Sequence, residues 1–439
     1  MIVALLGGSS RYDPVQIAAL RPLCALMMIP ALYWLNGADL RRGLGPSLLL
    51  GLFASWVAIQ LVPLPPSIWE NLPDRRTIAE IDQLAGLTDV WRPLSMAPFR
   101  GLNALASLIV PVTALALALG FKATSRQLFL LIVGIGLIDA SLGLLQVMGG
   151  SRSPLYLFPI ASSGAAPGIF ANENHSAVFS AIVLLVIARL GLTSRAIKEP
   201  AWLRLGYVAA FMVISLALLV SGSRAGLLAG LIAVCCAAFL IWQASAPQTI
   251  KSGPARGEGL VSHRFALPAL FGSIALLVVA FVWAERTPAF RDLFEANAFE
   301  DLRWALWPTL QGMMKAHWIL GSGIGSFDAV YHIYEPTGLL LPLYVNQAHN
   351  DWAQVVIEGG LPAIGILAGL SLWMAMALKD LRKNKRSHAL PELVFWIAVL
   401  ALIGAASIVD YPLRTPVFQA VFVWLLLALG HDRTPQSRS

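Results

Sequence analysis

Long apolar segments constrain this chain more strongly than any other feature of its sequence. Segments of about 18 or more apolar residues recur along it, and each could cross about 30 Å of hydrocarbon as a helix. Only 13% of its 439 residues are charged, whereas a soluble domain usually carries about a quarter. The sequence therefore predicts an integral membrane protein that crosses a bilayer about eleven times.

The apolar segments predict an all-α fold, a polytopic transmembrane bundle of about 11–12 helices in a single domain, 1–439. The predicted helices are 17–35, 46–63, 102–120, 127–148, 174–192, 204–220, 224–242, 265–284, 353–378, 392–409 and 415–430. We expect the long segment 285–352 to form a loop with short amphipathic helices. The apolar run from Val3 to Leu6 is too short to span, and we interpret it as the remnant of a truncated first helix rather than a signal peptide.

Basic residues in the short loops predict how the helices are oriented. At least two Lys or Arg residues lie in each of the segments 36–45, 121–126, 193–204, 243–264 and 379–391. Because basic loops stay in the cytoplasm, these segments should lie inside, and 64–101, 221–223 and 285–352 should lie outside. The net charge of +7 then reflects topology, so we expect the lipid bilayer as a partner and no nucleic acid.

Several common site types are missing from the sequence. Cys24, Cys235 and Cys236 lie in apolar segments, where they are small apolar fillers rather than a disulfide framework. There is no D-x-D, H-E-x-x-H or C-x-x-C motif, and no G-x-S-x-G nucleophile motif. We therefore expect neither a metal site nor a cofactor.

Two polar motifs lie at helix ends on the predicted outer side. The segment S-G-S-R-A-G at 221–226 places Arg224 between two apolar helices, where its planar guanidinium could bind phosphate oxygens; the alternative is an Arg that reaches lipid headgroups. The segment G-I-F-A-N-E-N-H ends in Asn172, Asn174 and His175. These three side chains are candidates for lining a polar cavity, although helix capping is an equal alternative.

Two further motifs lie where the chain enters its last helices. His349, in Q-A-H-N-D-W-A-Q, could take up a proton near neutral pH, unless it caps a helix or packs in the core. Asn350 beside it resembles a helix N-cap residue and is a candidate cavity residue. The turn D-Y-P-L-R-T-P adds Asp410 and Arg414, which line the same cavity or pair with each other.

The long outer segment contains one predicted amphipathic helix. Its apolar residues recur at helical spacing and are Trp304, Trp307, Leu310, Met314 and Trp318. We expect the helix to start at Pro308, with Arg303 near its start. The Gly-rich segment 321–327 lacks a following Lys-Ser/Thr and is therefore not a nucleotide-binding P-loop.

Taken in order, these motifs resemble the O-antigen ligase/polymerase family over about residues 130–420. The resemblance rests on F-x-N-x-N-H, S-G-S-R-A-G, R-W…G-x-G-x-F, H-N-D, E-G-G-L-P and D-Y-P-L-R-T-P, which occur in this sequence in that order. Members are polytopic glycosyltransferases of the bacterial inner membrane. They move a glycan from undecaprenyl pyrophosphate, on the periplasmic face, to an acceptor such as the lipid A–core or another repeat unit.

The resemblance implies roles for individual residues. Arg224 and Arg303 would bind the donor pyrophosphate, and His349 would be the general base that deprotonates the acceptor hydroxyl. The leading hypothesis is an O-antigen ligase that works without a metal. A polymerase of O-antigen or exopolysaccharide is the alternative within the family. From another class, a transporter of polyprenyl-linked glycans would need ionisable residues deep in several helices, whereas here they concentrate at the outer ends.

Overall fold

The computed structural model describes residues 1–11, 14–158, 165–196, 199–245, 298–340, 345–383 and 389–433, with side chains except at 194–196, 244–245 and 298–303. Within these ranges, eight helices are long and apolar enough to cross a membrane. They are α2 (Val15–Trp34), the pair α7 (Pro98–Ser107) and α8 (Ile109–Gly120), α9 (Ser125–Gly149), α10 (Glu173–Ala196), α11 (Ala201–Val220), α12 (Arg224–Ser245), α17 (Asp351–Lys383) and α18 (Ala389–Val409). The shorter α4 (Leu44–Ile59) and α19 (Pro416–Arg433) pack among them.

The predicted all-α, multi-pass membrane fold is confirmed. Ten of the eleven predicted helices coincide with helices of the structure, with ends that differ by a few residues. The predicted helix 102–120 is the α7–α8 pair, which is interrupted at Leu108. The remaining one, 265–284, lies outside the described residues.

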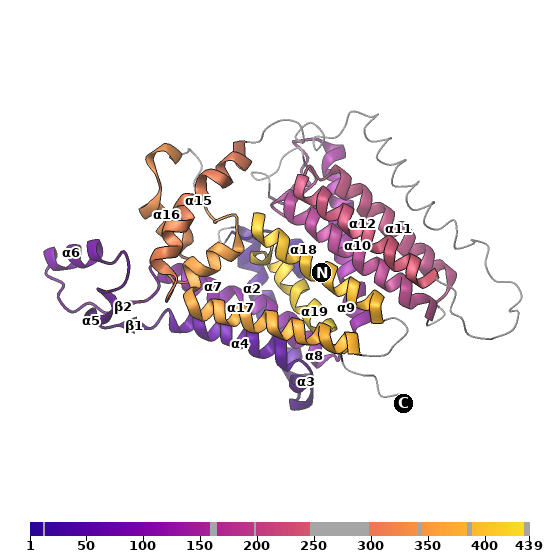
Figure 1. Ribbon diagram of the computed structural model, residues 1–439, viewed down its shortest axis with the longest axis horizontal. Coiled ribbons are helices and arrows are strands. Elements are labelled where there is room, and N and C mark those ends of the chain that lie inside the picture. The colour runs from indigo at the N-terminus through magenta and orange to yellow at the C-terminus, as the bar shows by residue number, and fades with distance from the viewer. Residues whose placement is uncertain are drawn as a thin grey trace, which may run out of the picture.

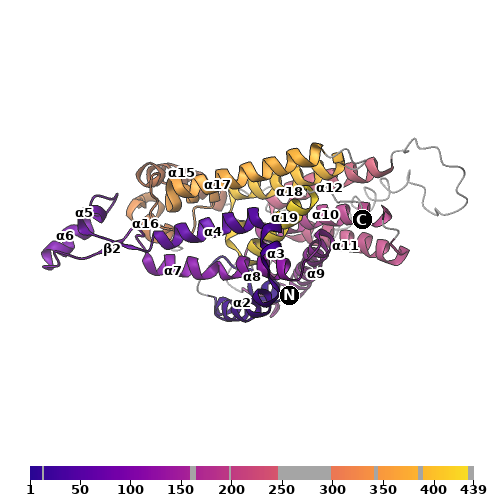
Figure 2. The same cartoon turned by 90° about the horizontal axis from the view of Figure 1, so that it is seen from below.

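The shorter elements gather mainly at one end of the bundle. They are α1 (Ile2–Leu6), α3 (Gly37–Arg42), α5 (Pro66–Trp69), α6 (Arg76–Leu84), α15 (Ala298–His317), α16 (Phe327–Tyr334), η1 (Thr337–Leu339), η2 (Pro412–Arg414) and the antiparallel strands β1 (Pro63–Leu64) and β2 (Arg92–Pro93). Figures 1 and 2 show α5, α6, α15 and α16 beyond the end of the bundle at which α17 begins. We call this end the α15 end; α10, α12, α17 and α19 all begin there.

Helix α10 forms the centre of the bundle. It packs against α9, α11, α12 and α18, and every residue from His175 to Leu190 is buried. A helix that is apolar on all faces can be stable only when neighbours cover all of them. The segment 172–175 at the start of α10 is therefore held rigidly in the middle of the bundle, at the α15 end.

The E-G-G-L-P and G-S-G-I-G-S motifs fold against each other. Helix α17 breaks at Gly360, which has φ of 59°, and the break frees backbone carbonyls that need new partners. The carbonyl of Glu358 accepts hydrogen bonds from Gly323 N at 3.0 Å and Gln60 Nε2 at 2.9 Å. A Cβ on Gly321 would lie 2.2 Å from that same oxygen. The Gly-rich segment therefore supports the broken end of α17 through backbone hydrogen bonds and close packing.

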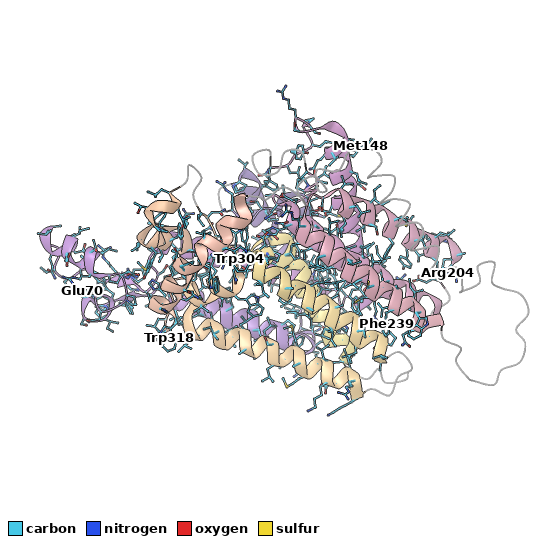
Figure 3. All side chains as sticks on the ribbon, turned by 45° about the horizontal axis from the view of Figure 1, so that its top comes forward. Glu70, Met148, Arg204, Phe239, Trp304 and Trp318 are labelled. Carbon is cyan, nitrogen blue, oxygen red and sulfur yellow. The ribbon has the colours of Figure 1, made fainter. Side chains whose placement is uncertain are left out.

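Helix α15 is the predicted amphipathic helix, but its predicted start at Pro308 was wrong. The helix begins at Ala298, so Pro308 lies inside it rather than at its start. An interior proline removes one backbone hydrogen bond and crowds the preceding turn, and the packing of α15 on α16 opposes this cost. The packed face consists of Leu306, Leu310 and Met313. Trp304 is therefore 80% exposed, and Figure 3 shows it with Trp318 on the α15 end of the molecule.

Candidate active site

The carboxylate of Asp410, directly after α18, is the point on which the predicted polar motifs converge. Its Oδ2 accepts hydrogen bonds from the side-chain amides of Asn172 at 3.0 Å and Asn174 at 3.2 Å. Its Oδ1 accepts one from the backbone N–H of Tyr411 at 3.0 Å. Asp410 is buried, and a buried carboxylate needs such donors, each contributing about 1.5–3 kcal/mol.

Two histidines face the same carboxylate. His175 Nε2 lies 3.5 Å from Asp410 Oδ1, and His349 Nδ1 lies 3.8 Å from it. Both rings pack edge-on against Tyr411, with centroids 5.3 and 5.0 Å away. The side chain of His349 is 22% exposed, whereas that of His175 is only 3% exposed. His349 is therefore the histidine that a substrate can reach, and His175 belongs to the interior.

The backbone of His349 has a conformation that side-chain-bearing residues seldom adopt. Its φ is +49°, in the left-handed region where such residues are uncommon. Directly after it, Asn350 Oδ1 accepts a hydrogen bond from Ala353 N at 2.9 Å, which is the predicted N-cap of α17. Unusual backbone geometry of this kind tends to occur at functional sites, where the surrounding structure enforces it.

Two residues that the sequence analysis did not single out hold the Asn-rich segment in place. Asp139 Oδ1 accepts a hydrogen bond from Ile169 N at 2.9 Å, and its Oδ2 accepts one from Ser176 Oγ at 2.8 Å. Gln146 bonds both the N–H and the carbonyl of Gly168, each at 2.9 Å. Both residues belong to α9 and are buried. An aspartate within an otherwise apolar helix was the signal that could have identified this support.

Arg224 lies at the start of α12 and is linked to the Asp410 cluster through its neighbour. Ser223 Oγ accepts a hydrogen bond from Gly226 N at 2.8 Å, which caps α12, and donates one to Asn174 Oδ1 at 2.6 Å. Asn174 in turn bonds Asp410. The S-G-S-R-A-G motif and the Asn-rich segment are therefore one hydrogen-bonded unit, and Arg224, which is half-buried, lies at its edge.

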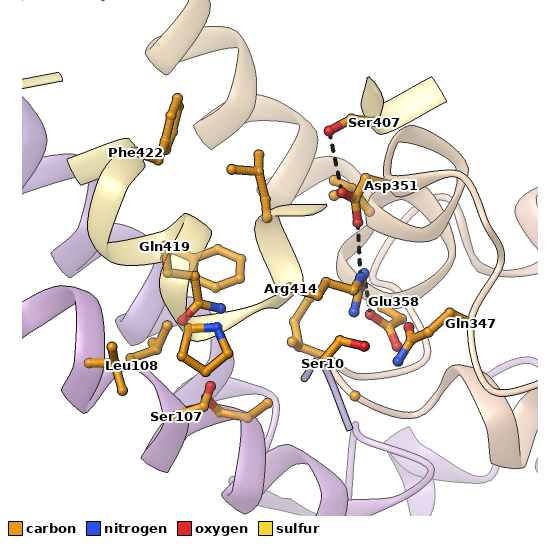
Figure 4. Close-up of a pocket in the computed structure, with 18 of the residues that line it drawn as sticks. Ser10, Ser107, Leu108, Gln347, Asp351, Glu358, Ser407, Arg414, Gln419 and Phe422 are labelled. Carbon is orange, nitrogen blue, oxygen red and sulfur yellow. Dashed lines mark hydrogen bonds and ion pairs between the residues drawn. The ribbon is translucent and has the colours of Figure 1, made fainter. Parts of the chain in front are cut away.

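Arg414 has different partners from those considered in the sequence analysis. Its Nε donates to Asp351 Oδ1 at 3.0 Å, and its terminal nitrogen donates to Glu358 Oε2 at 3.1 Å, rather than to Asp410. Figure 4 shows this chain of contacts continuing from Asp351 to Ser407. Burial disfavours the guanidinium charge, but the two carboxylates outweigh it and raise the pKa of Arg414. Arg414 thus joins η2 to both ends of the first segment of α17.

A groove adjoins this network, and only one of the six candidate cavity residues lines it. Arg414 forms part of its wall, together with Asp351 and Glu358. Asn172, Asn174, His175, Asn350 and Asp410 do not line it. Arg303 belongs to α15, but its side chain is outside the described residues. Within the described ranges, no group of three or more His, Cys, Asp or Glu side chains could hold a metal ion.

Comparison with models of protein families relates part of the chain to a known family. The model of a family described as O-antigen ligase matches residues 209–368. This range contains Arg224, Arg303, His349 and the α17 break, and it ends before Asp410. No curated protein matches the chain.

Proposed function

Since the chain belongs, through residues 209–368, to the O-antigen ligase family, we propose that it transfers a glycan from undecaprenyl pyrophosphate to an acceptor hydroxyl. The family supports a glycosyltransferase of the ligase or polymerase type that acts on lipid-linked glycans in a membrane. The donor, the acceptor and the periplasmic location of the site are our proposals. Transfer to lipid A–core is the leading form, and polymerisation is the alternative.

The observation that carries the proposal is the approach of His349 to a buried carboxylate. Because Nδ1 of His349 faces Asp410, a proton on Nδ1 leaves Nε2 as the acceptor for a substrate proton. Nε2 then removes the proton from the acceptor hydroxyl, and the resulting oxygen attacks the anomeric carbon. Asp410 stabilises the imidazolium that forms, as a carboxylate does in other base–carboxylate pairs.

The bond from the anomeric carbon to the pyrophosphate oxygen breaks as the new glycosidic bond forms. Its electron pair stays on the pyrophosphate, which therefore gains negative charge. We assign Arg224 to this group, because a guanidinium can donate two parallel hydrogen bonds to phosphate oxygens and stabilise the developing charge. The Ser223–Asn174–Asp410 contacts support this assignment, since they connect the Arg224 turn to the base. Arg303 remains a second candidate for the same role.

The test is transfer by purified protein supplied with undecaprenyl pyrophosphate-linked glycan and candidate acceptors, without added metal or nucleotide. His349→Ala should lower kcat by about 10²–10⁴-fold, the usual contribution of a general base. Arg224→Ala should lower it by about 10²–10³-fold, as for loss of one charge-stabilising donor. Matched controls are His332→Ala and Arg76→Ala, because both side chains are exposed, at 53% and 93%. Wild-type rates in His349→Ala would exclude it as the base.

A further inference from the structure

A groove of about 410 Å³ lies among α2, α7, α17, α18 and α19, next to the residues assigned to the reaction. Its charged lining residues are Arg11, Arg21, Arg100, Arg414, Asp328, Asp351 and Glu358. Among the described residues that line it, none comes from α10, α11 or α12. The groove is therefore separate from the turn that carries Arg224, and the proposed function leaves it without an occupant.

The groove has a charged end and an apolar end. Its charged residues lie toward the α15 end, whereas apolar residues line it farther along the helices; these are Phe53, Leu370, Met374, Leu400, Ile403 and Phe422. The lining on α7 and α8 extends from Arg100 to Val110, a distance of about 15 Å along a helix. That is about half of a 30 Å hydrocarbon core. The shape suits a molecule with a polar head at the membrane surface and an apolar tail in one leaflet.

The charges at the polar end favour an anion. Arg414 is neutralised by two carboxylates, and Arg100 pairs with Asp328 at 2.9 Å. Arg21, by contrast, donates to the neutral amide oxygen of Asn103 at 2.8 Å, and no carboxylate lies within ion-pair distance of it among the described residues. With Arg11, the lining has four arginines and three carboxylates. A phosphate group placed here would accept charge-assisted hydrogen bonds from Arg21 and would compete with Asp328 for those of Arg100.

The groove reaches the loop that carries the base, although His349 itself does not line it. Asn346 and Gln347 line it just before His349, and Asp351 lines it just after. Figure 4 shows Gln347 beside Glu358 and Arg414 at this end. A sugar hydroxyl attached to a lipid head in the groove would therefore lie close to the loop that carries His349.

We propose that this groove binds the acceptor, and that the acceptor is a single-tailed amphiphile with a phosphate-type head. The inference rests on the proposed function, because it takes His349 as the base and Arg224 as the residue that binds the donor pyrophosphate. Pockets for a drug-sized ligand measure about 300–1,000 Å³, so 410 Å³ holds one head and one chain rather than a lipid with several acyl chains. Donor and acceptor are then both lipid phosphates, which favours polymerisation over transfer to lipid A–core.

The experiment counts binding sites for farnesyl phosphate, a single-tailed phosphate, by native mass spectrometry of the detergent-solubilised full chain. We expect the wild type to bind two molecules, one at each site. The double variant Arg21→Gln with Arg100→Gln should lose the groove site and keep one, and Arg224→Gln should lose the other. Ile403→Trp, which fills the apolar end while leaving the arginines unchanged, should also retain one. Arg41→Gln with Arg42→Gln, at the opposite end of the bundle, should still bind two.

The outcomes separate this inference from the proposed function. Two bound molecules in the Arg21/Arg100 double variant would overturn the groove proposal, whatever Arg224→Gln shows. If Arg224→Gln binds two molecules and the double variant binds one, the groove proposal is supported. The assignment of Arg224 to the donor pyrophosphate is then contradicted. Farnesol, which lacks the phosphate, and inorganic phosphate, which lacks the chain, test whether the groove recognises both parts of the molecule. Equal occupancy of the groove by farnesol, or complete displacement by inorganic phosphate at the same concentration, would overturn the assignment to a phosphate amphiphile.

Discussion

At the scale of single residues, Asp410 organises the candidate site although it takes no part in bond making. It receives hydrogen bonds from Asn172 and Asn174 and faces both histidines. We expect Asp410→Asn to lower kcat by about 10²-fold or more, because the amide can neither fix the tautomer of His349 nor stabilise its protonated form. The donor KM should change little, since Arg224 is untouched. Steady-state kinetics with varied donor concentration measure both quantities.

A purely structural role for Asp410 makes a different prediction. In that case kcat and KM would change together as the Asn-rich segment and Arg224 lose their shared support. Asp410→Glu provides the matched comparison, because it keeps the carboxylate and should recover part of kcat. A glutamate variant no more active than the asparagine variant would argue against the carboxylate's charge as the relevant property.

The sequence identified most of these residues singly but not as one cluster. Asn172, His175, His349 and Asp410 stood out because polar residues at the ends of apolar helices are conspicuous. Their convergence depends on how α10, α17 and α18 pack, and no local pattern encodes that. Arg414 shows the same limit: Asp410 was its nearest acid in sequence, yet the fold gives it Asp351 and Glu358.

At the scale of elements, the segment 63–93 was not predicted as a folded unit. Its strands have only two residues each and contain Pro63 and Pro93, so the alternation that indicates a strand is absent. Tertiary contacts hold the segment instead. Arg92 pairs with Asp82 at 2.6 Å, and Trp69 Nε1 donates to Val90 O at 2.8 Å.

One buried histidine joins this segment to α15 and should make the junction sensitive to pH. His317 Nε2 lies 2.9 Å from Asp74, which also accepts a hydrogen bond from Tyr334. Burial lowers the pKa of His317 below its ordinary value of 6.5; Asp74 opposes this shift, and Arg75 adds to it. A lowered histidine pKa means that the folded state disfavours the proton. The stabilisation is therefore complete above pH 6.5 and is lost as pH falls through the lowered pKa.

Hydrogen–deuterium exchange of the segment 63–93 tests this expectation. After correction for the intrinsic pH dependence of exchange, protection should be lower at pH 5 than at pH 7.5. His317→Gln keeps a hydrogen-bond donor but cannot titrate, so its protection should vary much less over the same range. Protection in the wild type that rises at low pH would show that the sign of the linkage is wrong.

At the scale of the whole molecule, a second buried polar network ties the helices together at the end opposite α15. Arg189 of α10 contacts Glu392 of α18 at 2.9 Å and Asp432 of α19 at 3.6 Å. Trp396 also donates to Asp432, at 3.0 Å. Arg189→Met would leave two carboxylates without their cation, at a cost of about 3–5 kcal/mol. Thermal unfolding in nanodiscs should show a clearly lower Tm, whereas a Tm equal to that of His349→Ala would contradict this role.

The two ends of the bundle carry different kinds of residue, and this difference makes the orientation of the chain in the membrane testable. Every helix that presents a proposed reaction residue does so at the α15 end, and the described basic residues of the short loops, such as Arg42, Lys122 and Arg204, lie at the other end. If the basic loops are cytoplasmic, the site must face outward, where a lipid-linked glycan would meet it. We expect single cysteines replacing Arg76 or Arg152 to react with a membrane-impermeant maleimide in intact spheroplasts. Cysteines replacing Lys122 or Arg204 should react only after permeabilisation.

The labelling requires a background free of native cysteines, which are Cys24, Cys235 and Cys236. Alanine is a suitable replacement because all three lie within apolar helices, where we interpret them as small fillers. The background should therefore keep wild-type transfer activity, and this must be established first. Labelling of the Lys122 position in intact cells, with protection of the Arg152 position, would reverse the orientation. His349 and Arg224 would then face the cytoplasm, and a periplasmic reaction at this site would be excluded even if both residues proved essential.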